Sequence, residues 1–203
     1  MSFDRNKLKI LTLSERKSKA TIEKIAIDPD ATPPLIDGFD QIIDIIASTI
    51  IQAKQDKRSV ILAFGAHVIK NGLGSVLRRM IEEGFITHLA TNGAGSIHDW
   101  EFAYHGKSEE DVRANVQQGQ FGIWEETGKY INLALLVGAS CGKGYGESIA
   151  ELIHTDRIII PEPDEIKSLI LKMASNESSQ STQIGGLIDL LAAMNSHFGR
   201  EGI

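Results

Sequence analysis

Apolar positions recur along this chain with a spacing that changes between helical and extended. In residues 39–53, Phe39, Ile42, Ile46 and their neighbours repeat every three or four positions, which predicts an amphipathic helix. The continuous apolar run "SVILAFG" at 59–65 predicts a buried strand. Helical spacing returns in "LGSVLRRMIEEG", which Gly84 ends as a C-cap glycine, and "FITHLATN" predicts a second strand. This order predicts a βαβ unit with parallel strands.

The second half of the chain is richer in helical patterns. Ser108 begins "SEEDVRANVQQG", where a serine cap, acidic residues in the first turn and a closing Gly119 predict a helix. Helices are also predicted for 121–140, 142–156, 162–176 and 184–199, a short strand for "RIIIP" at 157–161, and a polar linker for 175–182. The pattern therefore predicts an α/β protein, helix-rich after residue 100, around a small parallel sheet.

Composition and charge exclude several classes of protein. The formal net charge of -6 gives a nucleic-acid partner no electrostatic support. No apolar run approaches the ~20 residues that span a bilayer, and the mixed-charge N-terminus lacks the apolar core of a signal peptide. Cys141 is the single cysteine, which allows no internal disulfide and is expected to be a buried, inert thiol. We therefore expect a cytoplasmic protein with neither a nucleic-acid nor a membrane partner.

Two glycine-containing loops follow the two predicted strands, "GAHVIKNGLG" at 65–74 and "TNGAGSIHD" at 91–99. The carboxyl ends of adjacent parallel strands share one edge of a sheet, where open α/β sheets bind their ligands. Gly93 and Gly95 allow close approach of backbone N–H groups, and the helix N-termini after both loops favour an anion. Neither loop matches G-x-G-x-x-G, and no Walker sequence is present. A nucleotide crevice and a purely structural edge both stay open at this point.

Other side chains suggest alternatives to a nucleotide site. His98, Glu101 and His105 fall at i, i+3 and i+7 on one helical face, and both side-chain types bind zinc. The set does not match H-E-x-x-H, so we expect no metal. "GKGYG" at 142–146 resembles a phosphate loop but follows no strand, which predicts a tight connection between helices. His67 follows a strand end, where it would face a ligand or bond to the backbone.

The segment from "AFGAHVIKNGLG" to "TNGAGSIHDWE", with "SEEDVRANVQQGQFGIWEETG" after it, resembles the deoxyhypusine synthase family, and most closely its bacterial deoxyhypusine synthase-like branch. The similarity covers about residues 39–151. It implies a Rossmann-like three-layer parallel sheet flanked by helices in residues 31–203, after an N-terminal extension at 1–30. It also implies NAD as cofactor and a homo-oligomer. The true synthases oxidise spermidine and transfer its aminobutyl group to a lysine of a translation factor, so the implied substrate is a polyamine or related amine.

Carried over by position, the resemblance implies a cofactor site built from the two loops. The NAD-binding candidates are Ala66, His67, Val68, Ile69, Lys70, Asn71, Thr91, Asn92, Gly93, Ala94, Gly95 and His98. The acidic pair that follows the second loop in the true synthases falls on Ile97 and His98, so both acids are replaced. Asp99 and Glu101 are the substrate-side candidates, because a cationic amine is attracted to carboxylates.

The family's carrier lysine has no counterpart here. The sequence ends at Ile203 without the W-E-A-V-S-W-G-K motif, and Lys143, Lys167 and Lys172 lack its context. A lysine amine forms an imine with a carbonyl intermediate, so we expect no deoxyhypusine formation and a domain incomplete at its C-terminus relative to the family. The alternative function is a non-catalytic nucleotide-binding or assembly module.

Two later stretches predict self-association. "INLALLVGA" and "IGGLIDLLAAM" carry leucine and isoleucine on more than one helical side. A helix that is apolar all round must be buried, and symmetric association is the commonest way to cover leftover apolar faces. The sequence therefore predicts a dimer or tetramer assembled mainly through the helices after Phe121.

Overall fold

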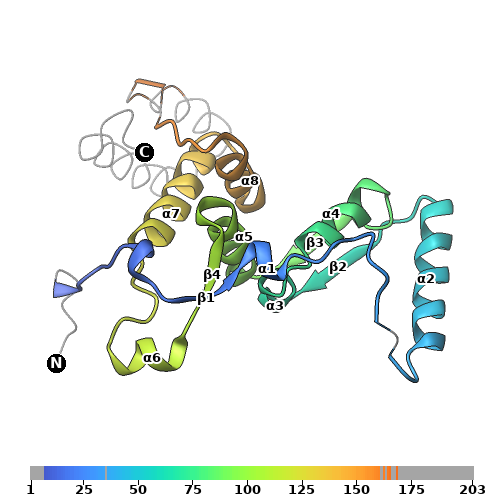
Figure 1. The fold of residues 1–203 in the computed structure, drawn as a ribbon. Coiled ribbons are helices and arrows are strands. Elements are labelled where there is room, and N and C mark those ends of the chain that lie inside the picture. Colours follow the sequence, from blue (N-terminus) through green and yellow to red (C-terminus); the bar gives the residue numbers. More distant parts are fainter. Residues whose placement is uncertain (1–6, 35, 161, 163, 166–167, 169–203) are drawn as a thin grey trace, which may run out of the picture. The chain divides into compact units, whose positions relative to one another are not determined.

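The computed structural model of the chain describes residues 7–34, 36–160, 162, 164–165 and 168 (Figure 1). Contacts divide the chain into two compact units. The central unit is formed by residues 17–121, and the flanking unit by residues 1–16 together with 122–203. The predicted boundary at residue 30 stays a prediction, although residues 18–25 contribute a strand and a helical turn to the central unit.

A parallel strand pair lies in the central unit. Strand β2 (Ile61–Phe64) pairs with β3 (His88–Thr91) in a register that runs from Ile61 opposite His88 to Phe64 opposite Thr91. Helices α3 (Ala66–Lys70) and α4 (Gly74–Glu82) lie between the two strands in sequence. Gly84 has a φ of 71°, the left-handed conformation expected of a C-cap glycine. The predicted parallel strand–helix–strand unit is confirmed.

The second sheet of the central unit is antiparallel. Strand β1 (Ser18–Thr21) pairs with β4 (Lys107–Glu110), with Ala20 opposite Ser108. The sequence placed residues 108–110 in a helix, but helix α6 (Val112–Gln117) begins only after Asp111. The Asp111 carboxylate accepts the N–H of Ala114 at 3.0 Å, and this bond, with a smaller contribution from Lys19, lowers the pKa of Asp111. The helix start was misplaced because the pairing partner β1 was not recognised.

Helices α1 (Ile22–Ile25), α2 (Asp40–Gln55) and α5 (Gly93–His105) complete the central unit. Its core is small and is formed by side chains from β1, α3, α4 and α5. The buried members are Ala20, Ile69, Leu77 and Phe102. Partly buried side chains from β2, including Leu62 and Phe64, pack against them. Strand β2 and the helices α3 and α5, which follow the two strand ends, therefore share one core.

The flanking unit is built around a helical hairpin. Helix α7 (Glu125–Ser140) connects to α8 (Tyr145–Thr155) through a short turn, which confirms the tight helix–helix connection predicted for "GKGYG". Gly138 permits close contact, because a Cβ there would overlap the Ser148 side chain. The short helix η2 (Leu13–Glu15) packs on α7, where the Leu13 N–H donates to the Glu126 carboxylate at 2.5 Å.

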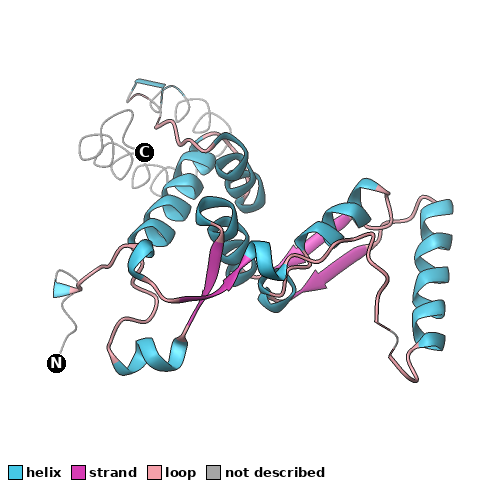
Figure 2. Cartoon of the chain, in the orientation of Figure 1, coloured by secondary structure: helices cyan, strands magenta, loops and turns pink. Residues whose placement is uncertain are grey.

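The predicted Rossmann-like three-layer parallel sheet is wrong. The described structure is 55% helical, with four short strands in two separate two-stranded sheets (Figure 2). A sheet of two four-residue strands has too little area to separate two layers of helices. The strand predicted at 157–161 does not form in the described residues 157–160, although Ile158 and Ile160 are buried.

Two further expectations concern a membrane-spanning helix and the elements predicted near the C-terminus. No helix among the described residues is long and apolar enough to cross a membrane. The predicted polar linker at 175–182 and the helix at 184–199 lie outside the described residues, as does most of the helix at 162–176.

Candidate functional site

The carboxyl ends of β2 and β3 lie side by side and lead directly into helices. Phe64 pairs with Thr91, whose hydroxyl donates to the Phe64 carbonyl oxygen at 3.0 Å. Gly65 is the N-cap of α3, and Asn92 is the N-cap of α5. The Asn92 side chain accepts the N–H of Gly95 at 3.1 Å. The structure thus brings the two predicted loops to one edge, which we call the strand-end edge.

Gly95 sets how closely α5 approaches β3. It is buried, and a Cβ at this position would overlap the hydroxyl oxygen of Thr91. The side chain of residue 91 is therefore accommodated only because residue 95 has none. Asn92, Gly93 and Ala94 are exposed at the start of this 13-residue helix. Their backbone lies where the positive end of the helix dipole favours an anion.

The first predicted loop divides into core-facing and exposed residues. Val68 packs against the core and Ile69 is buried in it. The Lys70 ammonium binds the Glu109 carboxylate at 3.1 Å, and Glu109 holds the left-handed φ of 71°. Ala66 is half-buried, whereas His67 and Asn71 are exposed. Among the side chains predicted to bind NAD in this loop, His67 and Asn71 are thus the ones open to a ligand.

A buried hydrogen-bonded cluster joins α5 to β4. Ser108 is 0% exposed and donates its hydroxyl hydrogen to Glu101 Oε2 at 2.5 Å. His98 Nδ1 lies 2.7 Å from the same hydroxyl oxygen. Because the serine hydrogen points to Glu101, His98 Nδ1 is the donor in its contact with the serine oxygen. The fold therefore holds His98 through this ring nitrogen.

Sequence reasoning missed this cluster. It assigned Ser108 to a helix cap and grouped His98 and Glu101 with His105 as a face that could bind zinc. The residues of the cluster are seven and ten positions apart and come from different elements, so no local spacing reveals them. Among the described residues, no group of three histidine, cysteine or acidic side chains could hold a metal ion.

The two substrate-side candidates differ in whether their carboxyl groups are open to a ligand. Glu101 is 1% exposed and accepts the Ser108 hydrogen, so its carboxylate is committed to the interior. Asp99 is exposed as a residue, yet the partial burial of its carboxyl group raises the pKa of Asp99. Asp99 is thus the member of the pair that could meet a ligand at the surface.

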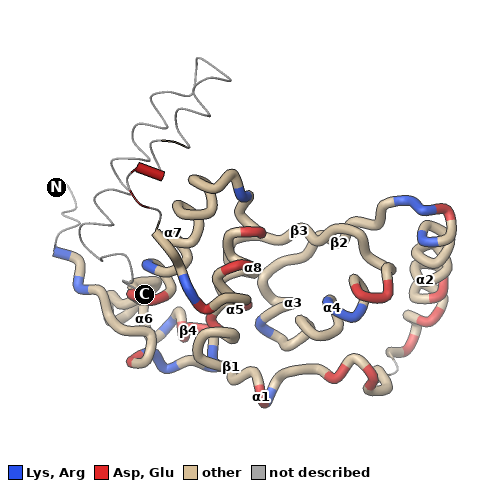
Figure 3. The backbone as a smooth tube through the Cα atoms, turned by 90° about the horizontal axis from the view of Figure 1, so that it is seen from above, with Lys and Arg blue, Asp and Glu red and all other residues tan. Residues whose placement is uncertain are grey.

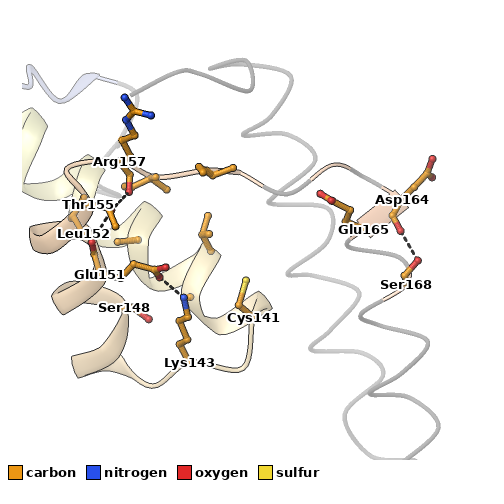
Figure 4. A pocket seen from close by; sticks show the side chains of 15 residues that line it. Cys141, Lys143, Ser148, Glu151, Leu152, Thr155, Arg157, Asp164, Glu165 and Ser168 are labelled. Carbon is orange, nitrogen blue, oxygen red and sulfur yellow. Dashed lines mark hydrogen bonds and ion pairs between the residues drawn. The ribbon is translucent and has the colours of Figure 1, made fainter.

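A separate cavity of about 900 Å³ lies in the flanking unit (Figure 4). Its apolar wall comes from α7, α8 and the segment after α8, and the Lys143 ammonium contacts the Glu151 carboxylate at 2.5 Å. This bond raises the pKa of Lys143, which keeps the amine protonated and unsuited to attack a carbonyl. Cys141 lines the cavity and is exposed, so its expected burial is wrong.

The strand-end edge is the candidate site because it combines exposed backbone with two helix starts. No protein-family profile, curated protein or solved structure matches this chain. The likeness to deoxyhypusine synthases therefore stays a prediction, and the assignment of the site depends on its geometry.

Proposed function

We propose that this protein is a deoxyhypusine synthase-like NAD-binding protein and that the strand-end edge is its cofactor site. One observation carries the proposal: β2 and β3 end beside each other, and each continues directly into a helix. The first residues of α5 are exposed, and α3 exposes His67 after a half-buried Ala66. Ligands of parallel strands bind at this edge, and a helix start supplies N–H groups to a phosphate.

The residues present fit a dinucleotide in three respects. Gly93 and Ala94 open α5 with exposed backbone that a pyrophosphate could approach. Gly95 packs helix against strand, which is the role of the third glycine in dinucleotide-binding turns. His67 in α3 and Asn71 at its C-cap add exposed polar side chains, suited to the sugar or amide groups of NAD.

Calorimetric titration of NAD tests the proposal. Gly93→Val should weaken NAD binding at least ~10-fold, because a branched side chain at the helix start blocks close approach of the pyrophosphate. Gly146→Val is the matched control, since Gly146 is also an exposed glycine in the first turn of a helix, with no other atom near its position. Its NAD affinity should equal that of the wild type.

Equal NAD heats for the wild type and Gly93→Val would contradict the proposed site. A wild-type protein that gives no heat with NAD at millimolar concentration would contradict cofactor binding altogether. Circular dichroism of both variants serves to show that the helices are retained.

A non-catalytic nucleotide-binding module is the second candidate, and the burial of Glu101 favours it. A polyamine site is expected to present several carboxylates, whereas the edge offers Asp99 while Glu101 bonds to Ser108. NAD-dependent dehydrogenation would move a hydride from the amine carbon to the nicotinamide. Formation of NADH that depends on spermidine, measured by the absorbance of NADH, would show that the protein is the enzyme. NAD binding without NADH formation would select the module.

A further inference from the structure

Asparagine is followed by glycine at two places in the chain, Asn71–Gly72 and Asn92–Gly93, and each pair lies in one of the two segments that form the strand-end edge. This dipeptide is chemically labile in water, because the glycine nitrogen can attack the side-chain amide of the asparagine with no Cβ in its way. In a folded protein the reaction needs a glycine N–H without a hydrogen bond and a main chain that can rotate. The two dipeptides differ in both respects.

The Asn92–Gly93 dipeptide meets both conditions. Asn92 and Gly93 are exposed, and Gly93 is the first residue of α5, where an N–H has no carbonyl of its own helix to bond to. Among the described residues, none accepts a hydrogen bond from the Gly93 N–H. The Asn92 side chain is held by the 3.1 Å bond that it accepts from the Gly95 N–H. Because the ends of helices open readily, this single bond is a small obstacle to rotation.

The start of α5 also favours the charges that the reaction forms. The Gly93 nitrogen becomes negative when it loses its proton, and Asn92 Oδ1 gains negative charge when that nitrogen adds to Cγ. Both atoms lie at the positive end of a 13-residue helix, whose dipole stabilises negative charge. The Gly95 N–H already donates to Oδ1, as a donor does in an oxyanion hole. The fold therefore places Asn92 where its side-chain amide is easily attacked.

The Asn71–Gly72 dipeptide is held in place on both sides of its glycine. Gly72 is buried, its N–H donates to the Ile69 carbonyl oxygen at 2.9 Å, and its own carbonyl oxygen accepts the N–H of Ile27 at 3.0 Å. The Gly72 nitrogen becomes available only when this turn opens and both bonds break. One hydrogen bond changes such an equilibrium by about a factor of five, so we expect Asn71 to react at least ~10-fold more slowly than Asn92.

We propose that Asn92 is a site of spontaneous deamidation, and that its conversion to a carboxylate closes the strand-end edge to anionic ligands. The Gly93 nitrogen loses its proton and bonds to Asn92 Cγ, and the side-chain nitrogen leaves as ammonia, which gives a five-membered succinimide. Water then opens the ring at either carbonyl and yields aspartate or isoaspartate, so nothing is oxidised or reduced. The second half of the proposal rests on the proposed function, in which NAD is the anionic ligand.

The new carboxylate would introduce charge into an uncharged stretch of the chain. Residues 84–98 contain no lysine, arginine, aspartate or glutamate, so the chain from β3 into the start of α5 is tan in Figure 3. A negative charge at residue 92 occupies the helix start to which a pyrophosphate would bind, and repels it. The isoaspartate product also adds one carbon to the main chain and removes the side-chain cap of α5. Both products should therefore oppose the binding of an anion.

Peptide mapping by mass spectrometry of the full chain tests the modification. Trypsin places the two asparagines in separate peptides, 71–78 and 80–107. During incubation at mildly alkaline pH, the peptide with Asn92 should gain the mass of an amide-to-acid exchange at least ~10-fold faster than the peptide with Asn71. A sample kept at mildly acidic pH should react more slowly, because base removes the amide proton. Asn92→Ser retains a good N-cap and should leave peptide 80–107 unchanged in mass.

Calorimetric titration of NAD tests the consequence for the site. Asn92→Asp reproduces the aspartate product, and aspartate caps a helix as well as asparagine does, so the variant should keep its helical circular dichroism. It should bind NAD at least ~5-fold more weakly than the fresh wild type at low salt, with a smaller difference at high salt. The wild type should lose NAD binding during alkaline incubation in step with the modification of Asn92. Asn92→Ser should keep its own starting affinity over the same period.

Two results would overturn the proposal. The first is an Asn92 that stays intact or reacts no faster than Asn71. The second is an NAD affinity that is unchanged in Asn92→Asp, or in the wild type after Asn92 has reacted. A fresh wild type that gives no heat with NAD would contradict the proposed function and, with it, the effect on the ligand. The mass spectra of the same samples would still decide whether Asn92 is the site of deamidation.

Discussion

At the scale of single residues, Ser108 connects a helix to a strand through one hydroxyl group. It donates to the buried Glu101 carboxylate and accepts from His98 Nδ1. Burial of a carboxylate costs free energy unless hydrogen bonds replace its hydration. The Ser108 hydroxyl supplies one such bond to Glu101 and so contributes to the stability of the fold. The bond also orients His98, which follows the strand-end edge along α5.

We expect Ser108→Ala to lower the free energy of unfolding by about 1–3 kcal/mol, because it leaves Glu101 buried with one donor fewer. Urea denaturation followed by circular dichroism measures the change. Ser48→Ala removes an exposed serine that bonds only within its own helix, and should stay within about 0.5 kcal/mol of the wild type. Superimposable curves for Ser108→Ala and the wild type would show that the cluster contributes nothing to stability.

At the scale of elements, Gly72 controls how the end of α3 meets the segment after α1. It has a φ of 85°, and its carbonyl oxygen accepts the N–H of Ile27 at 3.0 Å. A Cβ at this position would overlap the carbonyl oxygen of Ile25. Residue 72 is therefore a glycine for two reasons, its left-handed backbone and the closeness of a neighbouring backbone.

Gly72→Ala should lower the free energy of unfolding by at least ~3 kcal/mol, through left-handed strain and displacement of the Ile25 backbone together. Gly106→Ala separates the two causes, since Gly106 has a φ of 72° but no atom near its Cβ position. That variant should lose only the ~1–2 kcal/mol of the left-handed conformation. Thermal unfolding of the two variants compares their losses of unfolding free energy. Equal losses would mean that the Ile25 backbone moves aside without cost.

At the scale of the whole molecule, the chain enters the flanking unit, crosses to the central unit after Arg16 and returns after Phe121. Both two-stranded sheets and the strand-end edge fall within residues 17–121. The apolar helix α7 buries Ile131, Leu133 and Ala134, so part of its surface is already covered within the chain. Oligomerisation through the helices after Phe121 stays a prediction.

A fragment of residues 17–121 should fold and bind NAD with the affinity of the full chain, because the core and the candidate site both belong to the central unit. A fragment of residues 31–121 is the control. It lacks β1, whose Ala20 is buried in that core and which pairs with β4, so it should lose cooperative unfolding. Cooperative unfolding of the shorter fragment would instead support the predicted domain boundary at residue 30.

The site could be predicted in outline and not in detail. Apolar runs located β2 and β3, helical spacing located α4, and the glycine-containing segments marked the edge where both strands end. The two segments predicted as loops are largely helical, because α3 begins at Ala66 and α5 at Gly93. The sequence did not show which side chains near this edge are buried or bonded within the protein and which are open to a ligand. Ile69 is buried, Lys70 pairs with Glu109 and Glu101 bonds to Ser108, all through contacts with β4 or the core. These contacts join residues that no local pattern relates.

The sequence by itself determined several of the local elements, because apolar spacing records which side of a segment is buried. Helix α2, the α7–α8 hairpin and the parallel β2–β3 pair all follow from short windows of sequence. Tertiary structure alone decided the number and kind of the sheets. Pairing of β1 with β4 joins segments almost ninety residues apart, such as Ala20 and Ser108, and its free energy depends on a partner that neither segment's pattern contains. Burial likewise depends on which distant segment packs against a residue. Ser108 became buried because its strand meets α5, whereas the isoleucines of α2 stayed exposed.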